Sequence, residues 1–336
     1  MKNLVYIGNK LNRKGKTATT IDTLGKGLEA SGFKIYYASS YNNIVLRLMD
    51  MLWTVFKHRK TTDYVLIDTY STLNFYYAYS VSKLCQILNL KYIPILHGGN
   101  LPQRLKRSPK LSASIFKKAY LNSAPSNYLK TEFEKMGYTN VKLIPNSIQI
   151  EDYPFKTRVI DTVHLLWVRS FSKLYNPKLA VDVLYSLKNK EINATLCMVG
   201  PDNDGSLEDT KAYAKTLGLE VTFTGKLEKA AWVSLSEDYN LFINTTNFDN
   251  TPVSIIEAMA LGLPIVSTNV GGLPFLIEHN KEGVLVQPNN TEAFVEAILH
   301  YKNDELLCQS IVKQARIKAE TFDWEQVQQQ WVATLK

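Results

Sequence analysis

The sequence has few cysteines, and they are far apart. Its three cysteines are Cys85, Cys197 and Cys308. This spacing excludes a disulfide-stabilised scaffold and a cysteine metal cluster, and it is typical of reduced thiols in a cytosol.

Long hydrophobic runs are also missing. The longest apolar stretch, residues 44–56, is interrupted by Arg47 and Asp50. It is shorter than the roughly 18 apolar residues that a membrane-spanning helix requires. Met1-Lys2-Asn3 does not begin a signal peptide. We therefore expect a cytoplasmic protein and exclude secreted, collagenous and membrane-spanning classes.

The composition is that of a globular protein with two parts of opposite charge. The 336 residues are 45% hydrophobic and 21% charged, which suits two domains better than one. Residues 1–150 contain 22 Lys and Arg against 7 Asp and Glu, whereas residues 151–336 contain 17 against 24. The first half should therefore face something anionic, such as phosphates, a membrane surface or nucleic acid.

Short apolar runs alternate with helical stretches along the whole chain. This alternation predicts βαβ units, parallel sheets and two doubly wound α/β domains. Pro154 and polar residues between Asp152 and Thr162 interrupt the pattern and indicate the domain boundary. The predicted strands are Leu4–Ile7, Phe33–Ala38, Tyr64–Ile67, Tyr92–Leu96, Val141–Ile144, Val163–Val168, Ala194–Val199, Val221–Thr224, Leu241–Asn244, Pro264–Ser267 and Gly283–Val286.

The segment from Asn244 to Pro264 is the most informative for function. It leaves a strand, crosses a polar loop and enters a helix near Pro252. Backbone N–H groups around residues 251–254 suit a diphosphate, and the Glu257 carboxylate suits the vicinal hydroxyls of a ribose. Alternatively, Asp249 caps the helix and Glu257 lies on its surface.

This segment resembles the hallmark region of retaining glycosyltransferases of family 4, the glycosyl transferases group 1. In that family an acidic residue, seven intervening residues and a glutamate precede Ala-Met-Ala-x-Gly-x-Pro, and the match here runs from Asn247 to Gly272. The first acid is Asp249 where glutamate is usual. The resemblance implies a GT-B fold, with two Rossmann-like parallel-sheet domains facing a central cleft.

The resemblance also implies domain roles. Residues 1–155 would bind the acceptor and residues 156–321 the nucleotide sugar, while a terminal helix at residues 322–336 would cross back to the first domain. The donor would be a UDP-sugar or a GDP-sugar, and the acceptor a glycan or lipid-linked sugar in cell-surface polysaccharide or lipopolysaccharide assembly. The family works without a metal, so no metal or other cofactor is expected.

Further landmarks extend the resemblance over most of the chain. Leu96-His97-Gly98-Gly99-Asn100 looks like the family's loop whose histidine reaches the donor sugar, and Ile144-Pro145-Asn146-Ser147 looks like a landmark with Ser147 in place of glycine. Arg169 and Lys173 occupy the region of the arginine and lysine that hold the diphosphate. Their spacing is one residue shorter than usual, so Lys178 is the alternative lysine.

The candidate site residues follow from these motifs. We expect His97, Arg169, Lys173 and Asp249 to be catalytic. For donor and nucleotide binding we expect Glu257, Asn250, Thr251, Pro252, Val253, Ser254, Gly200, Gly225, Gly8 and Lys16, and on the acceptor side Asn100, Arg104 and Asn146.

A P-loop nucleotide-binding protein is one alternative. Gly8 to Thr17 contains Gly-Lys-Thr after a strand, and Asp68 ends a strand as a magnesium-binding aspartate would. However, the position where the phosphate loop needs its first glycine is Lys10. The sequence Asp202-Asn-Asp204 has the spacing of a metal-binding loop, but it lies in a Gly/Pro turn where these residues are ordinary turn formers.

A basic binding module is the other alternative. Nucleic-acid binding is not expected, because the second half is acidic and aromatic residues do not interleave with the basic ones. An anionic membrane surface fits better: Ile44, Leu48, Met51, Leu52 and Val55 recur at helical spacing before basic residues. The same spacing also fits a helix packed on its own sheet, and both interpretations stay open.

Overall fold

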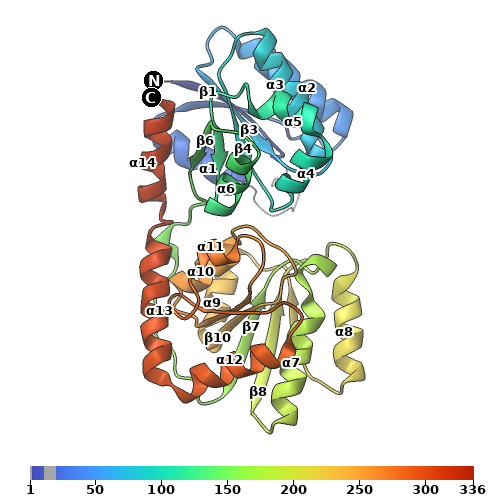
Figure 1. Ribbon diagram of the computed structural model, residues 1–336, viewed down its shortest axis with the longest axis vertical. Coiled ribbons are helices and arrows are strands. Elements are labelled where there is room, and N and C mark those ends of the chain that lie inside the picture. The colour runs from blue at the N-terminus through green and yellow to red at the C-terminus, as the bar shows by residue number, and fades with distance from the viewer. Residues whose placement is uncertain (1, 11–19) are drawn as a thin grey trace. The chain divides into compact units, whose positions relative to one another are not determined.

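The computed structural model describes residues 2–10 and 20–336, which form two α/β units (Figure 1). Unit 1 comprises the described residues up to Ser147 together with Trp324–Lys336, and unit 2 comprises Ile148–Asp323. Each unit contains one six-stranded sheet in which all pairings are parallel. No helix among the described residues is both long and apolar enough to cross a membrane.

Unit 1 has the strand order β2-β1-β3-β4-β5-β6. Its strands are β1 (Asn3–Ile7), β2 (Lys34–Ala38), β3 (Tyr64–Thr69), β4 (Tyr92–Leu96), β5 (Asn122–Ala124) and β6 (Val141–Leu143). Its helices are α1 (Thr20–Ala30), α2 (Ile44–His58), α3 (Asn74–Ile87), α4 (Leu101–Arg107), α5 (Pro109–Phe116), α6 (Asn127–Lys135) and α14 (Trp324–Leu335).

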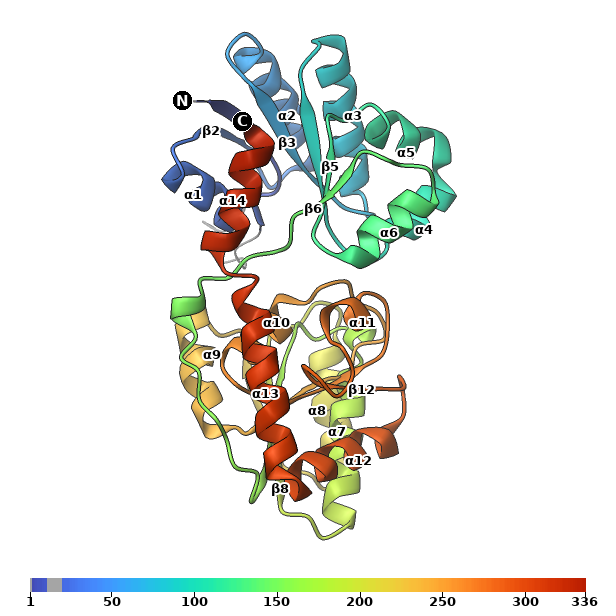
Figure 2. The same cartoon turned by 60° about the vertical axis from the view of Figure 1, so that its left-hand side comes forward.

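Alternating residues of β1 face opposite layers of helices, as the period of a strand requires. Leu4 and Tyr6 pack in the core under α1 and α14, and Val5 and Ile7 pack in the core under α2 and α3. Figures 1 and 2 show these two helix pairs on opposite faces of the sheet. Both faces of the sheet are therefore buried, which is why its strands read as continuous apolar runs.

The C-terminal helix α14 is an integral part of unit 1. Trp324, Val327, Trp331 and Leu335 recur at helical spacing and are buried in the core that includes β1. A Cβ atom at Gly27 of α1 would lie 2.4 Å from the Trp324 ring, so a glycine lets the two helices approach each other.

Unit 2 has the strand order β12-β11-β10-β7-β8-β9. Its strands are β7 (Val163–Val168), β8 (Ala194–Val199), β9 (Thr222–Gly225), β10 (Leu241–Asn244), β11 (Ile265–Thr268) and β12 (Val284–Val286). Its helices are α7 (Pro177–Asn189), α8 (Ser206–Thr216), α9 (Lys229–Leu235), α10 (Val253–Ala260), α11 (Leu273–Leu276), α12 (Thr291–Asn303) and α13 (Glu305–Glu320), with short 3-10 turns η2 (Ile150–Asp152), η3 (Lys173–Tyr175) and η4 (Ser236–Asp238).

The units divide between Ser147 and Ile148. The boundary expected from the sequence lay eight residues later, between residues 155 and 156. Ile148 and Tyr153 are buried in the core of unit 2, and the Ile148 N–H donates to the Phe322 carbonyl at 3.0 Å. Asp323 accepts the Ile150 N–H at 3.1 Å. The apolar residues before Pro154 therefore already belong to the second core.

Candidate functional site

The sheet of unit 2 reverses its direction of growth between β7 and β10. From β7 the chain adds β8 and β9 on one side, and β10 then pairs with β7 on the other side before β11 and β12 follow. In a doubly wound sheet such a switch point opens a crevice at the carboxyl ends of the two strands, where ligands bind. Arg169 directly follows β7, and the loop that contains Asp249 follows β10.

Arg169 and Asp249 form an ion pair at this switch point. Arg169 Nη2 donates to Asp249 Oδ2, and the second carboxylate oxygen accepts the Asn250 N–H at 2.8 Å. The guanidinium also lies 4.3 Å from the centroid of the Tyr175 ring. Burial lowers the pKa of Arg169, and the neighbouring Tyr175 opposes this shift. The two residues predicted to be catalytic in this unit are thus in contact.

Two buried donors at this edge have no hydrogen-bond partner among the residues that the structure describes. They are Nε of Arg169 and Oγ of Ser254, which lies in the first turn of α10. The residue that precedes α10 is Pro252, whose side chain cannot cap the helix, and the first N–H groups of a helix have no intrahelical acceptor. Buried donors are normally satisfied, and the positive end of a helix favours anions. This edge therefore has the chemistry of an anion-binding site.

Glu257 lies in the second turn of α10 and is buried, with 7% of its surface exposed. The Tyr153 hydroxyl donates to its Oε1 at 2.6 Å, and Lys229 Nζ lies 3.3 Å from the same oxygen. Burial raises the pKa of Glu257, while Lys229 and Tyr153 oppose the shift. The alternative that Glu257 is a surface residue is therefore wrong. The carboxylate is buried and held by side chains from two other segments.

Two glycine positions let the loops at this edge approach each other. A Cβ at Gly200 would lie 1.8 Å from the Arg169 carbonyl oxygen, and the φ of Gly200 is +151°. The Gly200 N–H donates to the carbonyl of Gly225 at 2.9 Å. A Cβ at Gly271 would lie 2.1 Å from the Asp249 carbonyl oxygen. Gly200 and Gly225 therefore shape the backbone of the loop behind Arg169.

The two candidate lysines point to different neighbours. Lys173 lies in the exposed turn η3, where its N–H donates to Asp204 at 3.0 Å and its carbonyl accepts from Asn247 at 3.3 Å. Lys178 lies in the first turn of α7, with Nζ 5.5 Å from the centroid of the Tyr213 ring on α8. Lys173 is thus connected to the loop that leads to Asp249, and Lys178 is directed at a neighbouring helix.

Asp202 and Asp204 act as turn formers. Asp202 Oδ1 accepts the Gly205 N–H at 3.0 Å, and Asp204 accepts from the backbone and hydroxyl of Ser206. These carboxylates stabilise the turn that leads into α8.

In unit 1 the corresponding switch point lies between β1 and β3, and it contains a buried cluster around Asp68. His97 Nε2 lies 2.8 Å from Asp68 Oδ1, and the Tyr6 hydroxyl donates to the same oxygen at 3.0 Å. Tyr70 stacks on the His97 ring at 4.8 Å. A Cβ at Gly8 would lie 2.5 Å from Asp68 Oδ2, so Gly8 is required by this carboxylate. Asp68 thus contacts a histidine and a tyrosine. The P-loop alternative had assigned this aspartate to a magnesium ion.

The acceptor-side predictions lie on the loops of the same unit. Asn100 is exposed and precedes α4. Arg104 donates to the carbonyls of Ser71 and Thr72 at 2.8 and 3.4 Å, which ties α4 to the loop before α3. Asn146 follows β6 and is half-buried. Lys16 lies outside the described residues, as does most of the loop on which the P-loop alternative was based.

Sequence reasoning missed several residues of these clusters, among them Tyr153, Asp68 and Lys229. Tyr153 stood in the predicted linker and Asp68 was considered only as a metal ligand. Lys229 follows Gly225 by four residues, and this proximity is the one signal that could have identified it. Tyr153 and Asp68 carry no local signal, because a tyrosine beside a proline and an aspartate at a strand end are both common.

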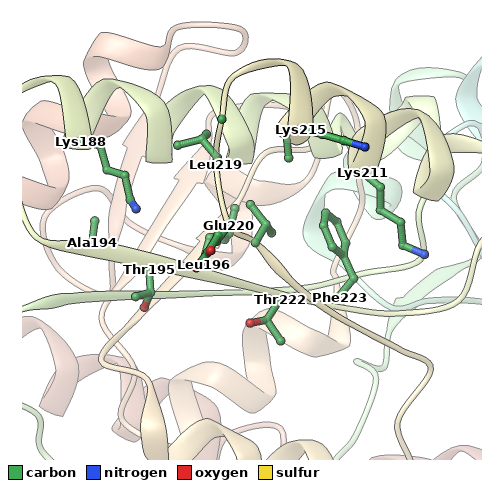
Figure 3. Close-up of a pocket in the computed structure, with 13 residues that line it drawn as sticks. Lys188, Ala194, Thr195, Leu196, Lys211, Lys215, Leu219, Glu220, Thr222 and Phe223 are labelled. Carbon is green, nitrogen blue, oxygen red and sulfur yellow. The ribbon is translucent and has the colours of Figure 1, made fainter.

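A separate hollow of about 570 Å³ lies elsewhere in unit 2 (Figure 3). It is formed by the amino-terminal part of β8, the start of β9 and helix α8. Lys188, Lys211 and Lys215 line it together with Thr195 and Thr222. Within the described chain its lining shares no residue with the predicted site, which is at the carboxyl ends of the strands.

Comparison with known sequences places the second half of the chain in a family. Residues 150–318 match the model of the glycosyl transferases group 1 family. The amylovoran biosynthesis glycosyltransferase AmsK of Erwinia amylovora is 26% identical over 255 residues, which are 70% of this chain and 61% of the relative. A glycogen synthase of Mycobacterium tuberculosis is 24% identical over 61% of this chain and 50% of the relative. The chain thus spans less than two thirds of the length of these curated relatives.

Solved structures share the fold of the whole chain. Sucrose-phosphate synthase of Thermosynechococcus elongatus superposes with a TM-score of 0.83 at 16% identity, covering 99% of this chain and 98% of that one. HepE of Anabaena, solved with UDP-glucose, superposes with a TM-score of 0.78 at 18% identity. The superposition covers 100% of this chain and 99% of HepE. The expected α/β fold with two parallel sheets, of the GT-B type, is confirmed. From the family match over half of its length, the chain belongs to the glycosyl transferases group 1 family.

Proposed function

We propose that this protein is a retaining, metal-independent glycosyltransferase that transfers a sugar from a nucleoside diphosphate sugar to a glycan or lipid-linked acceptor in polysaccharide assembly. The observation that carries this proposal is the edge of unit 2. There, within the described part of the chain, the buried donors Arg169 Nε and Ser254 Oγ lack hydrogen-bond partners, and α10 also carries the buried carboxylate of Glu257.

Each group at this edge matches one part of such a donor. Arg169 and the N-terminus of α10 offer positive charge to a diphosphate, and Lys173 adds an ammonium from η3. Glu257 offers carboxylate oxygens to two adjacent ribose hydroxyls, with Lys229 and Tyr153 fixing its position. The diphosphate competes with Asp249 for the Arg169 guanidinium. The Asp249 carboxylate that is released in this way then orients the donor sugar. In unit 1, His97 is the further residue that we propose to act in the reaction.

The reaction breaks the bond between the anomeric carbon and the diphosphate oxygen. The acceptor hydroxyl oxygen bonds to that carbon on the same face, and its proton passes to the departing diphosphate. Negative charge on the diphosphate grows in the transition state, so cationic groups that strengthen their contact there accelerate transfer. Arg169 and the α10 amides can supply this stabilisation with protein groups alone, which supports a reaction that needs no metal.

A UDP-sugar is our first choice of donor. HepE, which shares the fold, was solved with UDP-glucose. A GDP-sugar is the second choice. We also propose a cytoplasmic location, because donor sugars are made there.

The test is thermal unfolding with UDP, GDP or ADP in EDTA, for the wild type, Glu257→Gln and the surface control Glu296→Gln. A ligand that binds only the folded state raises the midpoint. One diphosphate should raise it in the wild type and the control but not in Glu257→Gln. No shift with any of the three, or a shift that needs added magnesium, would overturn the donor site.

The stereochemistry has its own test. The matching UDP- or GDP-sugar is incubated with mixed oligosaccharide acceptors, and NMR reads the anomeric configuration of the product. An α-linked sugar is expected from an α-linked donor. A β-linked product would overturn the retaining mechanism and leave the donor site intact.

A further inference from the structure

Helix α2 of unit 1 exposes large apolar side chains on its outer side. We call these residues the α2 face: Ile44, Val45, Leu46, Met49, Trp53 and Phe56. Their exposed fractions run from 40% at Phe56 to 69% at Ile44. A helix on the surface of a soluble protein normally directs charged and polar residues outward. A contiguous exposed apolar patch marks an interaction site.

The α2 face shares only Ile44 with the apolar stripe that the sequence suggested. Met51 and Val55 are fully buried, and Leu48 and Leu52 pack against the same core under the sheet, whereas Ile44 is exposed. The four packed residues are therefore the packing side of α2, as the alternative interpretation held. The core leaves the opposite side of the helix uncovered.

Basic residues adjoin the α2 face where the helix ends. Lys57 and Lys60 are exposed, and the Arg59 guanidinium lies 3.9 Å from the centroid of the Phe56 ring. The single acidic residue of α2, Asp50, is half-buried. The surrounding half of the chain contains 22 basic and 7 acidic residues. An occupant of this face should therefore be apolar at its centre and negatively charged around it.

An anionic lipid bilayer has these properties. Apolar side chains of a helix lying in the interface enter the boundary between headgroups and acyl chains, while lysines meet the lipid phosphates and a tryptophan settles at headgroup level. A second copy of the chain fits less well, because two equally basic faces repel each other.

We propose that the α2 face attaches this protein to anionic membrane surfaces, with Trp53 inserted at the interface. Helix α3 packs beside α2 in the same layer (Figure 2). This attachment is independent of glycosyl transfer, since it uses none of the residues assigned to the donor.

The tryptophans allow a direct test. All five tryptophans of the chain lie in the described residues, and Trp53 is 61% exposed whereas the other four are at most 8% exposed. Mixing the protein with vesicles of phosphatidylglycerol and phosphatidylcholine should shift the emission to the blue, whereas pure phosphatidylcholine should not. Trp53→Phe should still sediment with the anionic vesicles but lose the shift. Binding without any shift in the wild type would overturn the insertion of Trp53.

Matched variants test the surface itself. Met49→Ser/Trp53→Ser should lower the vesicle-bound fraction at least about tenfold, while Leu306→Ser/Ile317→Ser, two exposed apolar residues of α13, should not. Lys57→Glu/Lys60→Glu should weaken binding, and Lys211→Glu/Lys215→Glu on α8 should not. All variants should keep the wild-type unfolding midpoint, because the changed side chains are exposed.

Two outcomes would overturn the proposal. One is equal sedimentation of Met49→Ser/Trp53→Ser and wild type. The other is the absence of vesicle binding together with self-association that this variant abolishes, which would assign the face to a second copy. The vesicle assays use no donor, so their result stands apart from the fate of the proposed reaction.

Discussion

His97 and Asp68 form a buried pair in unit 1, with His97 Nε2 2.8 Å from Asp68 Oδ1. Asp68 is fully buried, and its Oδ2 has no hydrogen-bond partner within residues 2–10 and 20–336. A carboxylate accepts only, so Nε2 carries the proton that it shares with Asp68. Asp68 thus fixes the orientation of the His97 ring.

Replacing Asp68 should impair the proposed reaction through His97. Asp68→Asn offers an amide in place of the carboxylate, and we expect kcat to fall about tenfold, or ~1.4 kcal/mol, with a smaller change in the donor KM. His97→Ala introduced on top of Asp68→Asn should add little further loss. Fully additive losses in the double variant would contradict a positioning role for Asp68.

Glu257 should make the stability of the protein depend on pH. Burial raises its pKa above the usual 4.5, so the folded state binds this proton more tightly than the unfolded state. The free energy of unfolding contributed by Glu257 is therefore fully present below pH 4.5 and is lost as the pH rises through the raised pKa.

The variant that reveals this dependence is Glu257→Gln, which does not ionise. We expect urea unfolding at pH 4 to give the same free energy of unfolding for the variant and the wild type. As the pH rises to 7.5, the variant should become more stable than the wild type. If the wild type instead became more stable than the variant toward neutral pH, the attraction of Lys229 would lower the pKa of Glu257 by more than burial raises it.

Arg169→Ala should reduce turnover more than donor affinity. Its charge matters most when the diphosphate becomes more negative, so we expect kcat to fall about 100-fold, or ~3 kcal/mol, with a change in donor Kd of less than about tenfold. Single-turnover kinetics and calorimetry measure the two quantities, with exposed Arg107→Ala as the control. An affinity loss with intact turnover would exclude the proposed role.

Gly200→Ala should destabilise unit 2. The new methyl group would meet the Arg169 carbonyl oxygen at 1.8 Å, so the backbone beside Arg169 must shift. Gly137→Ala is the control, because Gly137 also has a positive φ but faces open space, and strain alone costs roughly 1 kcal/mol. Denaturant unfolding should show a clearly larger loss for Gly200→Ala, and equal losses would contradict the predicted clash.

The cysteines should resist alkylation until the protein unfolds. Burial raises the pKa of Cys85 and of Cys308 to about 12, so the reactive thiolate is scarce at pH 8, and all three thiols are buried. Labelling followed by mass spectrometry should find no modified cysteine in the native protein and three in urea. Fast labelling of Cys85 in the native state would disprove its burial.

The fold was predictable because its signals are local. Eleven of the twelve strands in the described residues were predicted, because each comes from a short, mainly apolar run between turns, a pattern that buried parallel strands impose. β5 escaped prediction since Asn122-Ser123-Ala124 is small and polar. Asn122 is nevertheless fully buried, and its amide donates to the Phe116 carbonyl at 3.0 Å.

The site was predictable only where its residues share a motif. Asp249 and Glu257 lie eight residues apart in one loop and helix, so a single segment identifies both. Tyr153 reaches Glu257 from 104 residues away, and Asp68 meets His97 across 29. Such contacts depend on strand order, which no local pattern contains.

The membership of α14 in unit 1 has a consequence for how the chain is made. Trp324, Val327, Trp331 and Leu335 complete the core built on β1, yet they are synthesised only after the whole of unit 2. Unit 1 is synthesised first but cannot close its core until the intervening unit has emerged, whereas unit 2 is continuous and can fold as it appears. A ribosome stalled just before residue 324 should therefore display a native second unit beside a first unit that proteases still cut.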